Sequence, residues 1–161
     1  MTIEFILNGE DVTVETEAEN RLVDILRNNF RLTGTKAGCL NGSCGACSVF
    51  FNGNVVKSCL ISAFQIRKSE IITIEGFLLT DEYQDIVQGF SKSNFENCGF
   101  CENGKILTAE ALLGRNLRPA KEEILKAFSG IKCRCTDPEE LTQAVLAAAE
   151  HRRRRLYGRS S

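Results

Sequence analysis

Histidine is almost absent from this sequence. The one histidine, His151, lies near the end of a chain of 161 residues. A histidine-rich zinc site and a Rieske centre, which needs two histidines, are therefore excluded. Most of the chain also lacks the side chain that most often serves as a general acid or base. No G-x-x-x-x-G-K-[ST] loop, G-x-G-x-x-G turn or G-x-S-x-G elbow occurs, so the chain offers little that could act on a substrate.

Long apolar segments are also missing. No apolar run approaches the roughly 20 residues that a membrane-spanning helix needs. Residues 1–8 have neither the basic start nor the long apolar stretch of a secretory signal peptide. We therefore expect a soluble, cytoplasmic protein without a membrane span.

Acidic and basic residues nearly balance, with a net charge of −1, but they are distributed unevenly. Five arginines fall in the last ten residues, so residues 1–151 alone carry −6. These arginines are Arg152, Arg153, Arg154, Arg155 and Arg159. Such a basic tail could contact nucleic acid or an acidic partner. No basic or aromatic pattern elsewhere supports nucleic-acid binding, so we interpret the tail as a solvated helix end whose cations complement the helix dipole.

Cysteine, by contrast, is abundant, with eight in the chain. Three of them have the spacing C-x4-C-x2-C, and a fourth follows after eleven more residues. The four are Cys39, Cys44, Cys47 and Cys59. This is the spacing of a plant-type [2Fe–2S] cluster, which four thiolates hold. Three glycines in the loop, Gly38, Gly42 and Gly45, fit this interpretation because a loop around a cluster needs tight turns and positive φ angles.

Disulfides and zinc are the two alternatives to an iron–sulfur cluster at these cysteines. Eight is an even number, so a disulfide framework is conceivable, but disulfides belong mainly to secreted proteins. Structural zinc sites usually pair their ligands as C-x2-4-C, with a second pair elsewhere. Here three ligands crowd into one loop. Spacing and compartment together favour iron and sulfide for this first set.

The other four cysteines form a second set, and each pair precedes an expected helix. They are Cys98, Cys101, Cys133 and Cys135. A helix N-terminus stabilises thiolates and a negatively charged cluster. Taken alone, this C-x2-C and C-x-C arrangement could also bind zinc. Next to the first set, it indicates a second redox centre and hence an electron path.

The first half of the chain reads as strands around one helix. Alternating apolar residues predict strands at 2–7 and 12–14, joined by an Asn8-Gly9 turn. A helix over 21–30 with Asn20 as N-cap follows. Further strands are expected at 48–51, 55–56 and 71–74, with a short helical turn at 60–65. These elements predict a mixed sheet with one helix on it.

The second half reads as four short helices, which predict a small bundle. The apolar positions indicate a helix near 83–91 and another near 106–113, closed by Gly114. Pro119 is expected to open the third helix and Gly130 to follow its end. Asp137 and Pro138 begin the fourth. The junction between the two halves is expected within residues 77–82.

The cysteine motifs resemble those of the iron–sulfur small subunit of the molybdenum hydroxylases, the xanthine dehydrogenase family. The resemblance covers residues 3–148. Its two segments are Gly38-Cys39-Leu40-Asn41-Gly42-Ser43-Cys44-Gly45-Ala46-Cys47 with Cys59, and Cys98-Gly99-Phe100-Cys101 with Cys133-Arg134-Cys135-Thr136. It implies an α+β chain: a ferredoxin-like β-grasp domain at residues 1–76, then a four-helix-bundle [2Fe–2S] domain with a basic tail at residues 77–161.

The resemblance also implies a role for the chain and for its partners. The chain would be the electron-transfer subunit of an oxidoreductase complex and would not itself catalyse the reaction on the substrate. Electrons would come from a molybdenum–pterin centre in a large subunit. They would pass through two [2Fe–2S] clusters, one on each cysteine set, to a FAD-binding medium subunit or another acceptor.

Several residues depart from the family pattern around the second set. Asn97 stands where the family usually has a glutamine that contacts the pterin, so it is the candidate for that contact. Glu102-Asn103-Gly104 replaces Thr-Pro-Gly, Gly130-Ile131-Lys132 replaces Gly-Asn-Leu, and Asp137-Pro138 replaces Gly-Tyr. We therefore predict that both clusters are kept, while the large-subunit partner differs from that of a standard xanthine dehydrogenase.

Two further functions remain open at this point. One is a free-standing two-cluster ferredoxin that shuttles electrons between changing partners. Such a shuttle should be monomeric with a charged docking face, whereas a subunit should expose apolar patches when isolated. The other is a zinc-stabilised interaction module. The sequence names neither the substrate of a complex nor its terminal acceptor.

Overall fold

The computed structural model of the chain describes residues 1–93, 101–131 and 137–158. Its N-terminal part is a five-stranded sheet with the order β2-β1-β5-β3-β4. The strands are β1 (Thr2–Leu7), β2 (Glu10–Glu15), β3 (Ser48–Phe51), β4 (Asn54–Lys57) and β5 (Glu70–Ile72). β1 and β5 run parallel, and the other neighbours run antiparallel. The expected mixed sheet, and with it the α+β fold class, is confirmed.

The first hairpin follows directly from its sequence. Ile3, Phe5 and Leu7 are buried while their neighbours along β1 are exposed, which is the period-2 pattern of a strand with one buried and one solvent-exposed face. Asn8 and Gly9 join β1 to β2 with φ angles of 51° and 85°. Positive φ at both central residues is the requirement of a type I′ hairpin turn, so the predicted turn is confirmed.

The helical segment on the sheet is more irregular than predicted. A short α1 (Leu22–Asp24) continues as a π-helical turn, η1 (Ile25–Asn29). The predicted N-cap, Asn20, is wrong: Arg21 occupies the cap position, and the Asn20 side-chain amide instead donates to Thr16 Oγ1 at 2.8 Å. The buried side chains of the segment, Leu22, Val23, Ile25 and Leu26, cover the sheet and the cysteine loop.

The last strand is shorter than predicted. β5 ends at Ile72, because the Asn8 side chain accepts from the Thr73 backbone N–H at 2.8 Å and donates to the Thr73 hydroxyl at 2.9 Å. Ile74 then begins α2 (Ile74–Phe77) and is not part of a strand. Between β4 and β5 the chain forms two 3-10 turns, η2 (Ser58–Leu60) and η3 (Ala63–Ile66), where a helical turn at 60–65 was expected.

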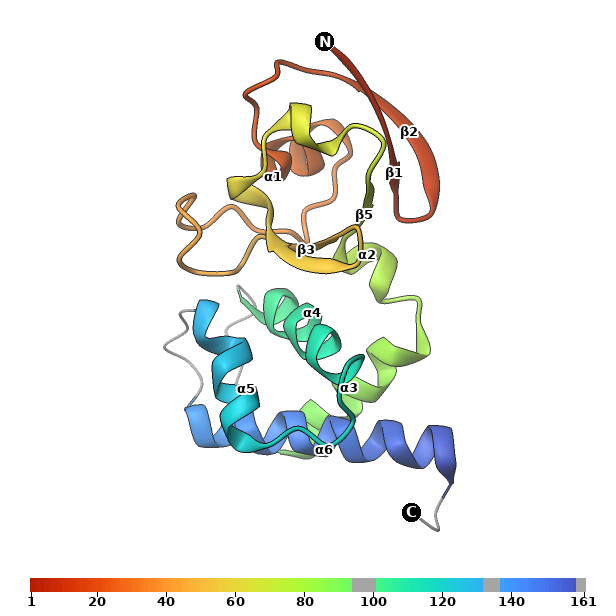
Figure 1. The fold of residues 1–161 in the computed structure, drawn as a ribbon, viewed down its shortest axis with the longest axis vertical. Helices are drawn as coiled ribbons and strands as arrows, with labels where there is room; N and C mark the ends of the chain where they lie inside the picture. The colour runs from red at the N-terminus through yellow and green to blue at the C-terminus, as the bar shows by residue number, and fades with distance from the viewer. Residues whose placement is uncertain (94–100, 132–136, 159–161) are drawn as a thin grey trace.

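The C-terminal part is helical, as expected. It contains α3 (Asp81–Lys92), α4 (Glu102–Leu113), α5 (Lys121–Ala127), the 3-10 turn η4 (Phe128–Gly130) and α6 (Pro138–Tyr157). Asp137 caps α6 by accepting from the Glu139 N–H, with Pro138 in the first helical turn, as predicted. The prediction for Pro119 is wrong, because α5 begins at Lys121 with Ala120 at the cap. With twenty residues α6 is not short, and in Figure 1 it runs beneath the other helices.

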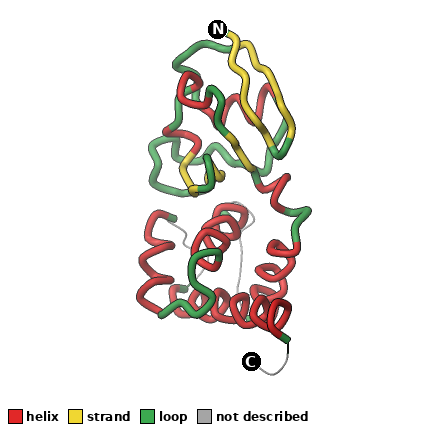
Figure 2. Tube along the Cα trace, turned by 45° about the vertical axis from the view of Figure 1, so that its right-hand side comes forward, coloured by secondary structure: helices red, strands yellow, loops and turns green. Residues whose placement is uncertain are grey.

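The two parts share a core across their junction. Phe50 of β3 and Phe77 of α2 belong to one buried cluster with Ile86, Ile106 and the other inward-facing helix residues. The Phe77 ring meets both Phe50 and Tyr83 edge-on, with centroids 6.2 Å and 6.1 Å apart. Figures 1 and 2 show α4 lying directly below β3, so the helical part packs on one end of the sheet.

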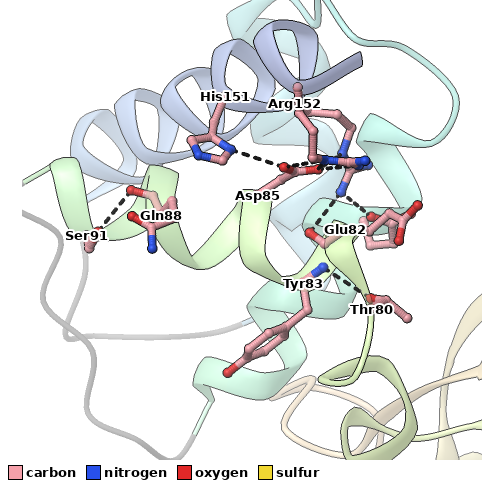
Figure 3. Close-up of polar contacts among 10 residues, drawn as sticks. Thr80, Glu82, Tyr83, Asp85, Gln88, Ser91, His151 and Arg152 are labelled. Carbon is pink, nitrogen blue, oxygen red and sulfur yellow. Dashed lines mark hydrogen bonds and ion pairs between the residues drawn. The ribbon is translucent and has the colours of Figure 1, made fainter.

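The basic end of α6 is partly buried, which corrects the interpretation of a solvated helix end. Arg152 is 3% exposed and donates to Asp85, Glu110 and the Glu82 carbonyl (Figure 3). Asp85 on α3 has no exposed side-chain surface and also pairs with Arg155 and His151. These ion pairs join α3, α4 and α6. Arg159 lies outside the described residues, and no helix within them is long and apolar enough to cross a bilayer.

Candidate metal centre

The loop at residues 38–47 connects the α1 segment to β3 and carries three cysteines of the first set. Gly42 and Gly45 have φ angles of 82° and 75°, so both glycines adopt the left-handed conformation expected of them. Leu40 does so as well, at 59°, whereas Gly38 is not among the residues with positive φ. The loop therefore turns repeatedly within ten residues, which aims backbone N–H groups at the cysteine sulfurs.

Cys39 receives the most of these N–H groups. Its Sγ accepts from the backbone of Ser43 at 3.2 Å, Cys44 at 3.3 Å and Asn41 at 3.5 Å. A hydrogen bond from the Ser43 side chain, followed by those from the backbone N–H groups of Asn41 and Cys44, lowers the pKa of the Cys39 thiol to about 5. A thiolate surrounded by N–H donors is what a cluster ligand requires, because the donors stabilise the negative charge of iron-bound sulfur.

Cys47 and Cys59 form a small buried cluster with Val23. The Cys59 backbone N–H donates to Cys47 Sγ at 3.5 Å, and both side chains are almost fully buried. Burial first, and then the neighbouring Cys47, raise the pKa of Cys59 to about 11. Two adjacent buried cysteine side chains suit a metal site, because metal binding deprotonates coordinating thiols outright. The donor set of the first loop thus fits a cluster.

The remaining predicted ligand of the first set, Cys44, is half-buried and its Sγ accepts from the Ala46 backbone N–H at 3.4 Å. All five described cysteines are free thiols. Within the described parts of the chain, no three histidine, cysteine, aspartate or glutamate side chains are arranged to hold one metal ion.

Of the second set, the structure describes Cys101 alone. Cys101 is 4% exposed and occupies the N-cap position of α4, as expected for a ligand at a helix N-terminus. The other predicted members, Cys98, Cys133 and Cys135, lie outside the described residues, as does Asn97. The second ligand set and the pterin contact therefore stay predictions.

The first turn of α4 rests on the loop of the first set. A Cβ atom placed on Gly104 would lie 2.4 Å from the Gly45 carbonyl oxygen, and one placed on Gly45 would lie 2.6 Å from Ile131 Cγ1. Asn103 adds a hydrogen bond across the same contact, from its side-chain amide to the Gly34 carbonyl at 3.0 Å. The segments that carry Cys44, Cys47 and Cys101 are thus in direct backbone contact.

Two partly or fully buried lysines lie near the cysteines, and the sequence-based prediction missed both. Lys57, at the end of β4, donates to the Gly42 carbonyl of the cysteine loop. Lys105 is 1% exposed and follows Cys101 by one helical turn. Its spacing of four residues from Cys101 places it on the same helix face, and that spacing was a usable signal. Nothing in the sequence near Lys57 indicates its contact.

Two family models match the chain. The model described as a 2Fe-2S iron-sulfur cluster binding domain matches residues 5–71, and the model described as a [2Fe-2S] binding domain matches residues 73–146. Together they cover both cysteine sets.

Named relatives match over nearly their whole length. The chain is 45% identical over 150 residues to the nicotinate dehydrogenase small FeS subunit of Eubacterium barkeri, covering 93% of this chain and 96% of the relative. It is 40% identical over 146 residues to the nicotine 6-hydroxylase small subunit of Paenarthrobacter nicotinovorans, covering 91% and 88%. A chain of quinoline 2-oxidoreductase from Pseudomonas putida 86 superposes with a TM-score of 0.83 at 35% identity, covering 95% and 96%.

Proposed function

Because the chain belongs to the iron–sulfur small-subunit family of the molybdenum hydroxylases, we propose that it relays electrons between two partner subunits. It is an electron-transfer subunit of an oxidoreductase with two [2Fe–2S] clusters. The observation that best supports the relay is the contact between Gly104 and the Gly45 carbonyl, because it places the helix turn that follows Cys101 against the loop of Cys39, Cys44 and Cys47 without intervening side chains.

The first cluster is held by Cys39, Cys44, Cys47 and Cys59, and the second by Cys98, Cys101, Cys133 and Cys135. We assign the first set to a domain of residues 1–76 and the second to a domain of residues 77–161. When bound, each cluster takes up and gives up one electron. The chain supplies the thiolates, donates backbone N–H groups to Cys39 Sγ, and keeps water from Cys47 and Cys59 by burial.

The partners follow from the family. A molybdenum-binding large subunit would lie next to the second set, with Asn97 as the candidate pterin contact. A FAD-binding medium subunit or another acceptor would dock beside the first set, in a cytoplasmic complex. Reduced cysteines are the normal state of that compartment, and the five described cysteines are free thiols.

Apolar side chains at the surface favour a subunit over a free shuttle. Leu60 and Phe64 are 58% and 59% exposed on the 3-10 turns η2 and η3, the first of which contains Cys59, and Leu79 is 83% exposed between α2 and α3. Leu60 also lies against Gly42, so this apolar surface borders the cysteine loop. Exposed apolar groups of this size are typical of surfaces that a partner covers.

Isolation of the native protein tests the proposal. We expect a coloured complex in which this chain co-elutes with two larger chains during size-exclusion chromatography of cell extract. Metal analysis of the chain should give iron and acid-labile sulfide. A lone 17.9 kDa species with both clusters would instead indicate the shuttle. A colourless protein with zinc and no sulfide would indicate the interaction module.

A further inference from the structure

Lys57 connects the sheet to the cysteine loop through one hydrogen bond. Its Nζ donates to the Gly42 carbonyl at 2.5 Å, and the side chain is half-buried. Among the residues that the structure describes, no carboxylate lies within ion-pair distance of it. The positive charge of Lys57 is therefore directed at the loop and is not neutralised by a local acid.

The Gly42 carbonyl that accepts from Lys57 belongs to the same peptide group as the Ser43 N–H, which donates to the predicted ligand Cys39. Gly42 C=O and Ser43 N–H are the two polar groups of one planar trans peptide, which places them on opposite edges. Lys57 lies at the carbonyl edge, and Cys39 Sγ lies 3.2 Å from Ser43 N at the other edge. A cation at a carbonyl polarises its peptide and strengthens the hydrogen bond that the N–H donates.

Lys57 also lies at the boundary with the second cysteine set. A Cβ atom placed on Gly130 would be 3.0 Å from Lys57 Nζ, so the ammonium group lies beside Gly130 at the end of η4. The segment that follows η4 leads to Cys133 and Cys135. The glycine at position 130 leaves room for the lysine, so the ammonium group lies between the Gly42 carbonyl and Gly130.

We propose that Lys57 is a positioning residue that holds the Gly42–Ser43 peptide against Cys39 and raises the reduction potential of the first cluster. This inference rests on the proposed function. Reduction adds one negative charge, and both a nearby cation and a stronger N–H hydrogen bond to a ligand sulfur stabilise that charge. Lys57 thereby makes the first cluster a better acceptor of electrons from the second.

The test is an EPR-monitored redox titration of the full chain, isolated with its clusters and any chains that co-purify. Lys57→Met removes both the charge and the donor. We expect the ratio of reduced to oxidised first cluster at a fixed potential to fall about tenfold, which is ~59 mV for a one-electron couple. Lys57→Arg keeps a cation and donors and should stay near the wild type. Lys68→Met is the matched control, because it removes the same charge from an exposed position away from the loop.

The possible results distinguish failure of this inference from failure of the relay. A shift of the first cluster in Lys57→Met alone, to more negative potential, supports the proposal. Equal potentials in Lys57→Met and Lys68→Met overturn it while leaving the relay intact. A wild-type chain without any [2Fe–2S] signal overturns the relay itself. If Lys57→Met does not retain iron, Lys57→Gln replaces it in the comparison with Lys68→Met. Glutamine keeps a hydrogen-bond donor but removes the charge, so the potential of the first cluster should shift in the same direction by a smaller amount.

Discussion

Replacing Gly104 with alanine tests the contact on which the relay depends. The new Cβ would lie 2.4 Å from the Gly45 carbonyl oxygen, whereas real Cβ atoms essentially never come within 3.0 Å of such an atom. The oxygen cannot move away freely, because it accepts from both the hydroxyl and the N–H of Ser48, at 2.7 Å and 3.2 Å. The helix and the loop must therefore separate.

The expected magnitude follows from two opposing effects. Overpacking a close contact costs about 1–3 kcal/mol. Alanine recovers at most about 0.5–1 kcal/mol relative to glycine, because that value holds for the middle of a helix and Gly104 lies in the first turn of α4. The net loss of about 1 kcal/mol lowers the melting temperature of a chain of this size by about 2–4 °C. Because the two cysteine segments move apart, the magnetic interaction between the reduced clusters should also weaken.

Scanning calorimetry of the cluster-loaded chain and EPR of its reduced form measure the two effects. Gly114→Ala is the matched control, because that glycine ends the same helix and its Cβ would meet only atoms of Glu110, at 3.1 Å or more. The melting temperature of the Gly114→Ala control should equal that of the wild type or lie slightly above it. A Gly104→Ala chain that melts like the control, with unchanged spin coupling, would refute the close contact.

Three further changes probe other parts of the molecule. Burial raises the pKa of Asp85, but hydrogen bonds from Arg155, His151 and Arg152 outweigh it and hold the pKa below its usual value. The stabilisation is therefore present at neutral pH and lost only as the pH falls through the folded pKa. Asp85→Asn at pH 7 should cost about 3 kcal/mol and lower the melting temperature by about 6–12 °C; a change under about 2 °C would contradict the buried network. Thr80→Ala removes the cap that accepts from Tyr83 N–H and should cost about 1 kcal/mol by calorimetry, and no loss would exclude that cap. Cys98→Ser should remove or disturb one EPR signal and leave the other, whereas loss of both would mean that the ligand sets are misassigned or that folding needs both clusters.

Local patterns predicted most of the elements correctly. The Asn8-Gly9 turn, the strands of the sheet and the Asp137 cap each depend on neighbouring residues, so a single sequence contains the whole signal. The cysteine spacing likewise identified a loop whose N–H groups do point at Cys39. Errors occurred at element ends. Ile74 reads as a strand residue, yet the Asn8 side chain ends β5 before it through a bond between residues 65 positions apart.

The charged core of the helical part was harder to predict. Arg152 continues the buried stripe of α6 one turn after Ala148, so its burial could have been read from the 3.6-residue period. Its partner could not, because Asp85 lies 67 positions away and one helix sequence does not identify the helix that packs on it. Asn103 was noted only as a departure from the family pattern, and its bond to Gly34 depends equally on tertiary packing.

The most direct measurement of the central claim is an iron and sulfide assay of the native chain combined with EPR during stepwise reduction. Two [2Fe–2S] clusters predict equal amounts of iron and acid-labile sulfide and two distinct one-electron signals, which develop at separate potentials. A chain that contains zinc, or that shows one signal or none on full reduction, would contradict the claim that its eight cysteines hold two clusters in sequence.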